Sequence, residues 1–137
     1  MNPTTPDTLA PNTPPHARPT VLVAEDDRAL RRYLEVVLQR AGYEVVAAAD
    51  GLEAMKAALN GSFQAVVTDA AMPHLNGHEL CRFLRSQPRF RGLPVLFLSG
   101  SEQDGQAGAY ADAHLSKPVR PEELTARLAE LLARHAA

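Results

Sequence analysis

The sequence predicts an α/β domain with a doubly wound, five-stranded parallel sheet. From Thr20 onward, short apolar segments alternate with amphipathic helical segments, and the apolar segments are mostly unbroken runs. Unbroken apolar strands suit a parallel sheet covered on both faces, and intervening helices provide right-handed crossovers. The 137 residues are 45% hydrophobic and 22% charged, so the chain can bury a core but is too short for two full-sized domains.

Five short segments have the character of strands. Each is mostly apolar, most contain valine, and turn-forming residues separate them from the helical segments. In chain order the predicted strands are Val21–Ala24, Tyr43–Ala47, Ala65–Val67, Val95–Leu98 and, more weakly, Ala113–Leu115.

Four helices follow from apolar spacing and end signals. The first, from Asp27 to Arg40, places its apolar residues on one face at i, i+4, i+7 and i+8, and Gly42 ends it. Shorter helices are expected from Gly51 to Asn60 and from about Gly77 to Ser86, where Cys81 belongs to the core. A last helix begins at about Pro121.

The first nineteen residues differ from the rest. Residues 1–19 hold six of the eleven prolines, and their only Lys, Arg, Asp or Glu residues are Asp7 and Arg18. Such a segment buries too little apolar area to offset its ordering entropy. We therefore expect a disordered N-terminal tail over 1–19 and one folded domain over 20–137.

Composition excludes several classes of protein. No apolar run approaches the ~20 residues that span a bilayer, and no secretory signal is present, so we expect neither membrane attachment nor export. The single cysteine excludes an internal disulfide and a cysteine-based zinc site. A net charge of −2 gives no general argument for direct nucleic-acid binding. A cytoplasmic protein is the natural expectation.

Polar residues gather where the predicted strands end. Glu25 and Asp26 follow the first strand and Asp69 follows the third, while Ser99 and Lys117 follow the fourth and fifth. Ligands of such sheets bind outside the carboxyl ends of the strands, and in the flavodoxin-like order 2-1-3-4-5 the first and third strands are neighbours. The three carboxylates would then converge on one cleft.

Converging carboxylates repel one another unless a cation lies between them. Hard oxygen ligands suit Mg²⁺, which binds a few carboxylates, waters and a phosphate oxygen. Taken alone, the acidic pair is as well explained by a solvated loop, and Asp27 by a helix N-cap. The polar residues at the other strand ends favour a metal site that meets a phosphoryl group.

These motifs resemble the bacterial response-regulator receiver domain of two-component signalling, including the chemotaxis receivers. The resemblance covers about 20–133. It rests on the acidic pair Glu25-Asp26, on Asp69 in Thr-Asp-Ala-Ala-Met-Pro, on Ser99, and on Lys117-Pro118. It implies the flavodoxin-like fold with strand order 2-1-3-4-5.

The resemblance implies a Mg²⁺ (or Mn²⁺) site. Asp26 and Asp69 would ligate the ion directly, and Glu25 would do so directly or through water. The backbone carbonyl of Ala71 would be a further ligand, which any side chain at that position allows.

The resemblance also implies the phosphoryl chemistry. Asp69 would be the phosphoacceptor, with Lys117 pairing first with it and then with a phosphoryl oxygen. Ser99 would bond the phosphoryl group and move toward it, and amides near Ala70 and Gly100 would donate to it. The Lys117-Pro118 bond becomes a candidate cis peptide.

Two departures from the family pattern concern its usual output face. His114 stands where most receivers carry Tyr or Phe as a switch residue, and histidine titrates near neutral pH. The stretch between Ser99 and Lys117 is short and contains Gly105 and Gly108, which each cost about 1 kcal/mol in a helix. We expect a short or missing helix there, the fourth of the family fold.

The favoured function is a stand-alone receiver that is not a classical enzyme, and whose only catalysis is its own phosphorylation and dephosphorylation. It would take phosphate from a sensor histidine kinase or a histidine phosphotransfer protein and signal to an unknown downstream protein. The alternative is a pseudo-receiver that binds partners without phosphorylation. A flavin-binding or hydrolytic relative is disfavoured because neither GxGxxG nor GxSxG occurs.

Overall fold

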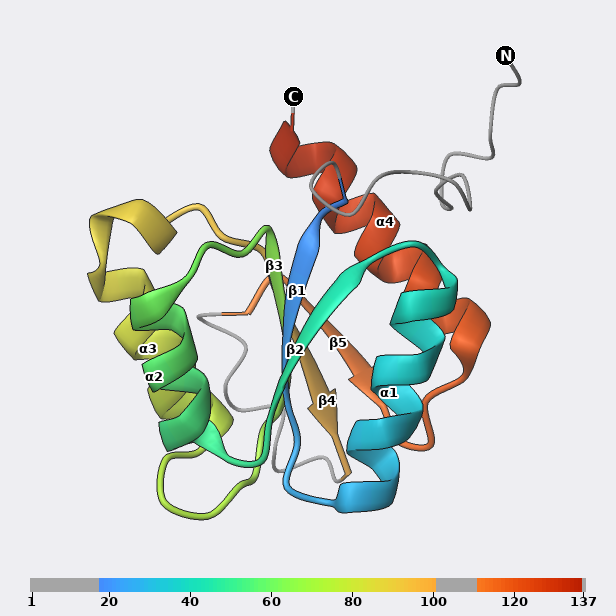
Figure 1. Ribbon diagram of the computed structural model, residues 1–137, viewed down its shortest axis with the longest axis horizontal. Coiled ribbons are helices and arrows are strands. Elements are labelled where there is room, and N and C mark those ends of the chain that lie inside the picture. Colours follow the sequence, from blue (N-terminus) through green and yellow to red (C-terminus); the bar gives the residue numbers. More distant parts are fainter. Residues whose placement is uncertain (1–17, 101–110, 137) are drawn as a thin grey trace.

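The computed structural model describes residues 18–100 and 111–136. Five parallel strands form one sheet in the predicted order β2-β1-β3-β4-β5 (Figure 1). Three strands run one or two residues beyond their predicted ends, and β2 is shifted by one residue. The strands are β1 (Thr20–Ala24), β2 (Glu44–Ala48), β3 (Ala65–Asp69), β4 (Val95–Ser99) and β5 (Ala113–Ser116).

Helices cover both faces of the sheet. Figure 1 shows α2 and α3 on one side and α1 and α4 on the other. The described helices are α1 (Arg28–Arg40), α2 (Gly51–Asn60), α3 (Gly77–Ser86), the single 3₁₀ turn η2 (Pro88–Phe90) and α4 (Pro121–Ala136). The predicted short or missing helix between β4 and β5 falls mostly on 101–110, which lie outside the described residues, so it stays a prediction.

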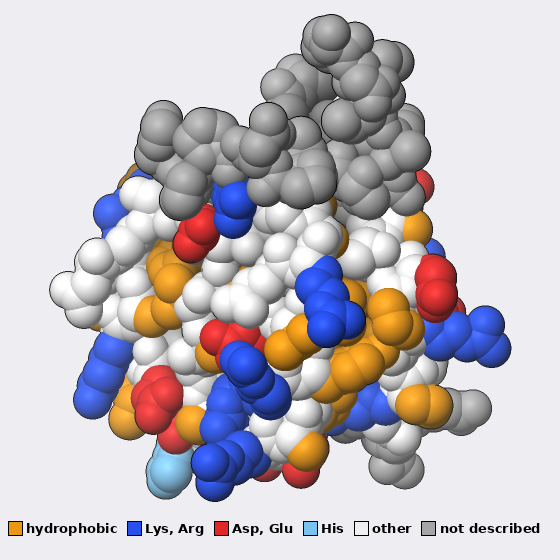
Figure 2. Space-filling model, turned by 45° about the vertical axis from the view of Figure 1, so that its right-hand side comes forward, with side chains coloured by type: hydrophobic (Ala, Val, Ile, Leu, Met, Phe, Trp, Pro, Cys, Tyr) orange, Lys and Arg blue, Asp and Glu red, His pale blue; other side chains and the backbone are white. Residues whose placement is uncertain are grey.

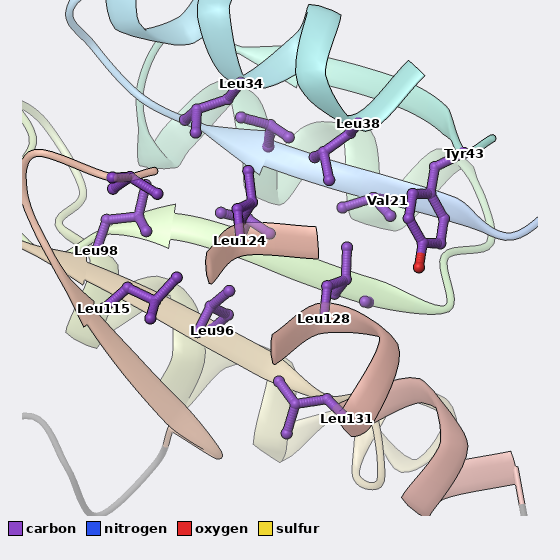
Figure 3. Close-up of a cluster of buried hydrophobic side chains, with 14 of the residues drawn as sticks. Val21, Leu34, Leu38, Tyr43, Leu96, Leu98, Leu115, Leu124, Leu128 and Leu131 are labelled. Carbon is purple, nitrogen blue, oxygen red and sulfur yellow. The ribbon is translucent and has the colours of Figure 1, made fainter. Parts of the chain in front are cut away.

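Two apolar layers hold the helices to the sheet. On the first face, leucines of α1 and α4 pack on β1, β3, β4 and β5. Figure 3 labels side chains of this layer from α1, α4, β1, β4 and β5. On the second face, α2 and α3 pack on a cluster centred on Phe97 and Leu22. Cys81 is fully buried in this second cluster, as predicted. Every strand of the sheet contributes to a core, which fixes the carboxyl edge as one rigid rim.

Helix starts are set by local side chains. Asp27 is the predicted N-cap of α1, and its carboxylate accepts a hydrogen bond from the Leu30 amide at 2.8 Å. Asn76 and Glu79 form a capping box at α3. A Cβ on Gly77 would lie 2.3 Å from the Asp69 carbonyl oxygen. Only glycine therefore lets α3 begin so close to the end of β3.

The predicted tail lies almost wholly in residues 1–17, outside the described residues. Its last residue is tied to the sheet, because the Pro19 carbonyl accepts a hydrogen bond from the Glu44 amide at 3.0 Å. Arg18 forms an ion pair with Glu44 at 3.6 Å. Residues 18 and 19, at the end of the predicted tail, thus contact β2, while the boundary at residue 20 stays a prediction.

Candidate functional site

Three carboxylates meet at the carboxyl edge of the sheet. Glu25 and Asp26 follow β1, and Asp69 ends the neighbouring strand β3. One carboxylate oxygen from each residue lies within 4.8 Å of the other two. Glu25 and Asp69 are buried and Asp26 is exposed. The structure thus brings together the acidic residues that the sequence predicts to converge.

A single ammonium group neutralises part of this charge. Lys117 follows β5, and its Nζ lies 3.1 Å from Asp69 Oδ2 and 3.4 Å from Glu25 Oε1. Burial alone would lower the pKa of Lys117, but its hydrogen bond to Asp69 and the charges of Glu25 and Asp69 outweigh that effect and raise the pKa. Lys117 therefore stays charged beside the two carboxylates. Its peptide bond to Pro118 is cis, as predicted.

Glu25 is the most deeply buried acid of the cluster. Burial raises the pKa of its carboxyl to about 7, and the Asp69 charge acts in the same direction. The hydrogen bond from the Asp27 amide and the charge of Lys117 offset only part of this effect. Its buried Oε1 is 3.4 Å from Lys117 Nζ, an ion pair without hydrogen-bond geometry, and among the described residues it accepts no hydrogen bond. A hard divalent cation between the carboxylates would relieve this strain, so the donor set fits Mg²⁺.

The backbone after β3 corrects one prediction. The Ala70 amide donates to the Leu98 carbonyl at 3.0 Å, which extends the β3–β4 ladder by one bond. It is therefore engaged and is not directed at a phosphoryl group on Asp69. The Ala71 amide is the one that faces Asp69, with its nitrogen 3.5 Å from Oδ1. The amide beside Asp69 is thus that of Ala71, one residue later than the Ala70 amide that the resemblance implies.

Ser99 and Gly100 reach the same rim from β4. Ser99 is half-buried, and its carbonyl accepts a hydrogen bond from the Lys117 amide at 2.9 Å. Asp69 is paired with Leu98 in the β3–β4 register, so Ser99 lies one residue beyond the strand partner of Asp69. A Cβ on Gly100 would lie 4.0 Å from the Lys117 side chain. The predicted site residues of β4 therefore border the acidic cluster and its lysine.

His114 lies on β5, where it is paired with Phe97 of β4. Its half-buried ring packs edge-on against Phe97, with ring centroids 5.7 Å apart. His78 contacts Phe97 as well, at 5.5 Å. Within the part of the chain that is described, the buried Nε2 of His114 has no hydrogen-bond partner. The ring occupies an inward position, which is compatible with the predicted switch role without testing it.

Arg31 and Tyr33 of α1 donate hydrogen bonds to the two segments that carry Glu25, Asp26 and Lys117. The sequence did not predict these contacts. Arg31 Nη1 donates to the Glu25 carbonyl at 2.9 Å and is 3.4 Å from the Asp26 carbonyl. The Tyr33 hydroxyl donates to the Val119 carbonyl at 2.8 Å, two residues after Lys117. No spacing rule distinguishes Arg31 from the other arginines of α1, because the contact depends on how the helix lies on the loop.

The response regulator receiver domain matches residues 21–129 of this chain. The chain belongs to this family. One similar protein is the response regulator MprA of Mycobacterium sp. (strain KMS), which is 44% identical over 118 residues. The match covers 83% of this chain and 50% of that protein, so this receiver chain spans about half the length of its curated relatives.

Solved structures agree with the family. A response regulator from Chloroflexus aurantiacus is 37% identical with a TM-score of 0.81, covering 85% of this chain and 99% of that one. The receiver domain of the sensor histidine kinase PA1611 from Pseudomonas aeruginosa is 26% identical with the same TM-score and coverage. That structure has a magnesium ion coordinated in its active-site cleft. The receiver has the flavodoxin-like fold, and none of its described helices is long and apolar enough to cross a membrane.

Proposed function

We propose that this receiver accepts a phosphoryl group on Asp69 from the phosphohistidine of a sensor histidine kinase or a histidine phosphotransfer protein. The observation that carries the proposal is the cluster of Glu25, Asp26 and Asp69 within 4.8 Å, with Lys117 3.1 Å from the proposed phosphoacceptor. Membership of the family and the magnesium-bound neighbour support it.

Mg²⁺, or Mn²⁺, would be held by Asp26, Asp69 and the backbone carbonyl of Ala71, with Glu25 acting directly or through water. When bound, such an ion neutralises charge on the phosphoryl oxygens and on the carboxylates. Buried Glu25 supports this assignment, because its pKa is raised and its Oε1 is paired with Lys117 at 3.4 Å without hydrogen-bond geometry. A bound cation would stabilise the charged form of its carboxyl.

In the transfer step, a carboxylate oxygen of Asp69 forms a bond to phosphorus as the bond between phosphorus and the histidine nitrogen breaks. Lys117 moves its ammonium group from Asp69 to a phosphoryl oxygen and so keeps a charged partner. Ser99 and the amides of Ala71 and Gly100 donate to the remaining oxygens. Positioning and charge neutralisation account for the chemistry, and attack by water on phosphorus returns Asp69 to its free state.

The phosphorylated receiver signals by binding a downstream protein in the cytoplasm, with Ser99 and His114 as its switch residues. It acts as a phosphoacceptor and not as a classical enzyme. The stand-alone arrangement stays a prediction, since the curated relatives are about twice as long as the match.

The proposal is tested with acetyl phosphate and Mg²⁺, followed by intact-protein mass spectrometry. The wild-type chain should gain one phosphoryl group, and Asp69→Asn should gain none. Chelation of the metal should abolish the gain in the wild type. Asp27→Asn is the matched control, because Asp27 neighbours the cluster but caps α1, and it should still be phosphorylated.

A wild-type chain that gains no mass under these conditions would contradict the proposal. Binding of an identified partner that is unaffected by Asp69→Asn would then favour the pseudo-receiver.

A further inference from the structure

We call residues 25–27, which connect β1 to α1, the acidic loop. Among the described side chains of α1, that of Arg31 donates hydrogen bonds to the backbone of this loop. Its Nη1 donates to the Glu25 carbonyl at 2.9 Å, and the Asp26 carbonyl is 3.4 Å away. Both contacted residues carry carboxylates of the cluster, and they are adjacent in sequence. One guanidinium group therefore holds the main chain of two proposed ligand residues.

The two proposed ligand residues differ in how many other contacts fix their position. Glu25 is fully buried, its amide donates to the Ala48 carbonyl at 3.1 Å, and its Oε2 accepts from the Asp27 amide at 3.0 Å. Asp26 is exposed, so core packing does not hold it. Arg31 is the donor that the structure provides for the Asp26 carbonyl.

The charge of Arg31 has an effect opposite to that of its hydrogen bonds. A positive guanidinium near the cluster repels a divalent cation and so weakens metal binding. Its hydrogen bonds order the loop and so favour metal binding, because partners that orient ligands typically change metal affinity by ~10-fold or more. The sign of the change on removing Arg31 therefore decides which effect dominates.

We propose that Arg31 is a positioning residue for the divalent-metal site and that its hydrogen bonds to the loop outweigh its electrostatic repulsion of the ion. This inference rests on the proposed function, since it concerns the same metal site. It assigns to α1 a part in metal binding that goes beyond covering the sheet.

The chain contains a matched control. Arg32 is adjacent on α1 and carries the same charge, and its Nη1 pairs with Glu35 at 3.1 Å. Its side chain is 69% exposed and has no contact to the acidic loop among the described residues. In Figure 2, basic side chains lie on several parts of this face, among them its lower part, the level at which α1 begins in Figure 1. General loss of charge from this region is thus reproduced by Arg32→Met.

The test is a Mg²⁺ titration of the full chain followed by ¹H–¹⁵N NMR, without kinase or phosphodonor. The same spectra report whether each variant is folded. Arg31→Met should bind Mg²⁺ about tenfold more weakly than the wild type. Arg32→Met should bind within about twofold of the wild type, or slightly more tightly.

Equal or tighter binding by Arg31→Met would overturn the inference, since only the charge would then matter. Arg31→Gln is also neutral and has the same expected sign, so it serves if the methionine variant does not fold. A wild-type chain that fails to bind Mg²⁺ would instead contradict the proposed function, which separates the two failures.

Discussion

The two edges of this sheet use charged side chains in opposite ways. At the amino edge, Arg85 pairs with Asp112 at 2.9 Å and donates to the Leu93 carbonyl at 2.6 Å. Asp112 also accepts from the Val95 amide at 2.8 Å, so this charge is matched by opposite charge and by backbone groups. At the carboxyl edge, three carboxylates face one lysine.

This contrast separates an ion pair whose charges match from a cluster whose charges do not. The amino-edge pair closes the starts of β4 and β5 and leaves no excess charge within the pair. The carboxyl-edge cluster has an excess of negative charge and a buried acid whose pKa is raised to about 7. Such an arrangement costs stability in the isolated fold, and a bound cation would offset that cost.

Breaking the amino edge should give the largest loss of stability. Arg85→Met removes the ion pair to Asp112 and donors to the Phe90, Arg91 and Leu93 carbonyls. We expect the free energy of unfolding to fall by about 3 kcal/mol, because a partly buried charge and several carbonyls lose their partner. Urea denaturation measures this, with the exposed Arg28→Met as a control that should change little. A loss equal to the control's would show that the pair is not structural.

Glu25 should give the metal-free protein a stability that depends on pH. Its folded-state pKa of about 7 lies above the ordinary value of 4.5, so the folded state binds its proton more tightly than the unfolded state. The resulting stabilisation is fully present below pH 4.5 and is lost as the pH rises through 7.

Relative to Glu25→Gln, the metal-free wild type should therefore lose roughly 2 kcal/mol of stability over that range. Thermal melts at a series of pH values test this. Added Mg²⁺ should reduce the loss by stabilising the charged carboxylate. Parallel pH profiles of wild type and variant would show that Glu25 is not the responsible group.

A smaller loss of stability should follow from removing a hydrogen bond to the segment that carries Lys117. Tyr33→Phe removes the hydroxyl that donates to the Val119 carbonyl at 2.8 Å and leaves the ring in place. We expect a loss of about 1 kcal/mol in denaturation experiments, the usual net contribution of one hydrogen bond. Phosphorylation by acetyl phosphate should slow with little change in Mg²⁺ affinity, since Lys117 and not the ligand loop is affected. A change confined to Mg²⁺ affinity would argue against this division.

The smallest effect should come from reducing the excess charge itself. Asp26→Asn removes an exposed carboxylate from the cluster, and without metal the variant should be as stable as the wild type or up to about 0.5 kcal/mol more stable. With Mg²⁺ present the order should reverse, because only the wild type gains binding energy. Melting temperatures with and without Mg²⁺ measure both quantities. A wild-type melting temperature that does not respond to Mg²⁺ would contradict the view that the carboxyl edge, unlike the amino edge, has negative charge that a cation neutralises.

Much of the fold and of the site could be predicted because the signals are local. Unbroken apolar runs identified all five strands, and the helix spacing and the N-cap Asp27 located α1 to within one residue. Since parallel strands present their carboxyl ends on one edge, Glu25, Asp26 and Asp69 were expected together before any coordinates.

Other features depend on contacts between distant segments. Whether Ala70 or Ala71 presents its amide to Asp69 is decided by where the β3–β4 ladder ends, because the Leu98 carbonyl engages the first of them. Which arginine of α1 reaches the acidic loop, and how deeply Glu25 is buried, depend on how the helix and strands pack. The sequence by itself determined the strands and the chemistry of the rim, through apolar patterns and polar strand ends, while the strand order was implied by the resemblance to the family. Only the tertiary structure decided which backbone groups and charges remain available there, because hydrogen bonds and burial between segments compete for the same atoms.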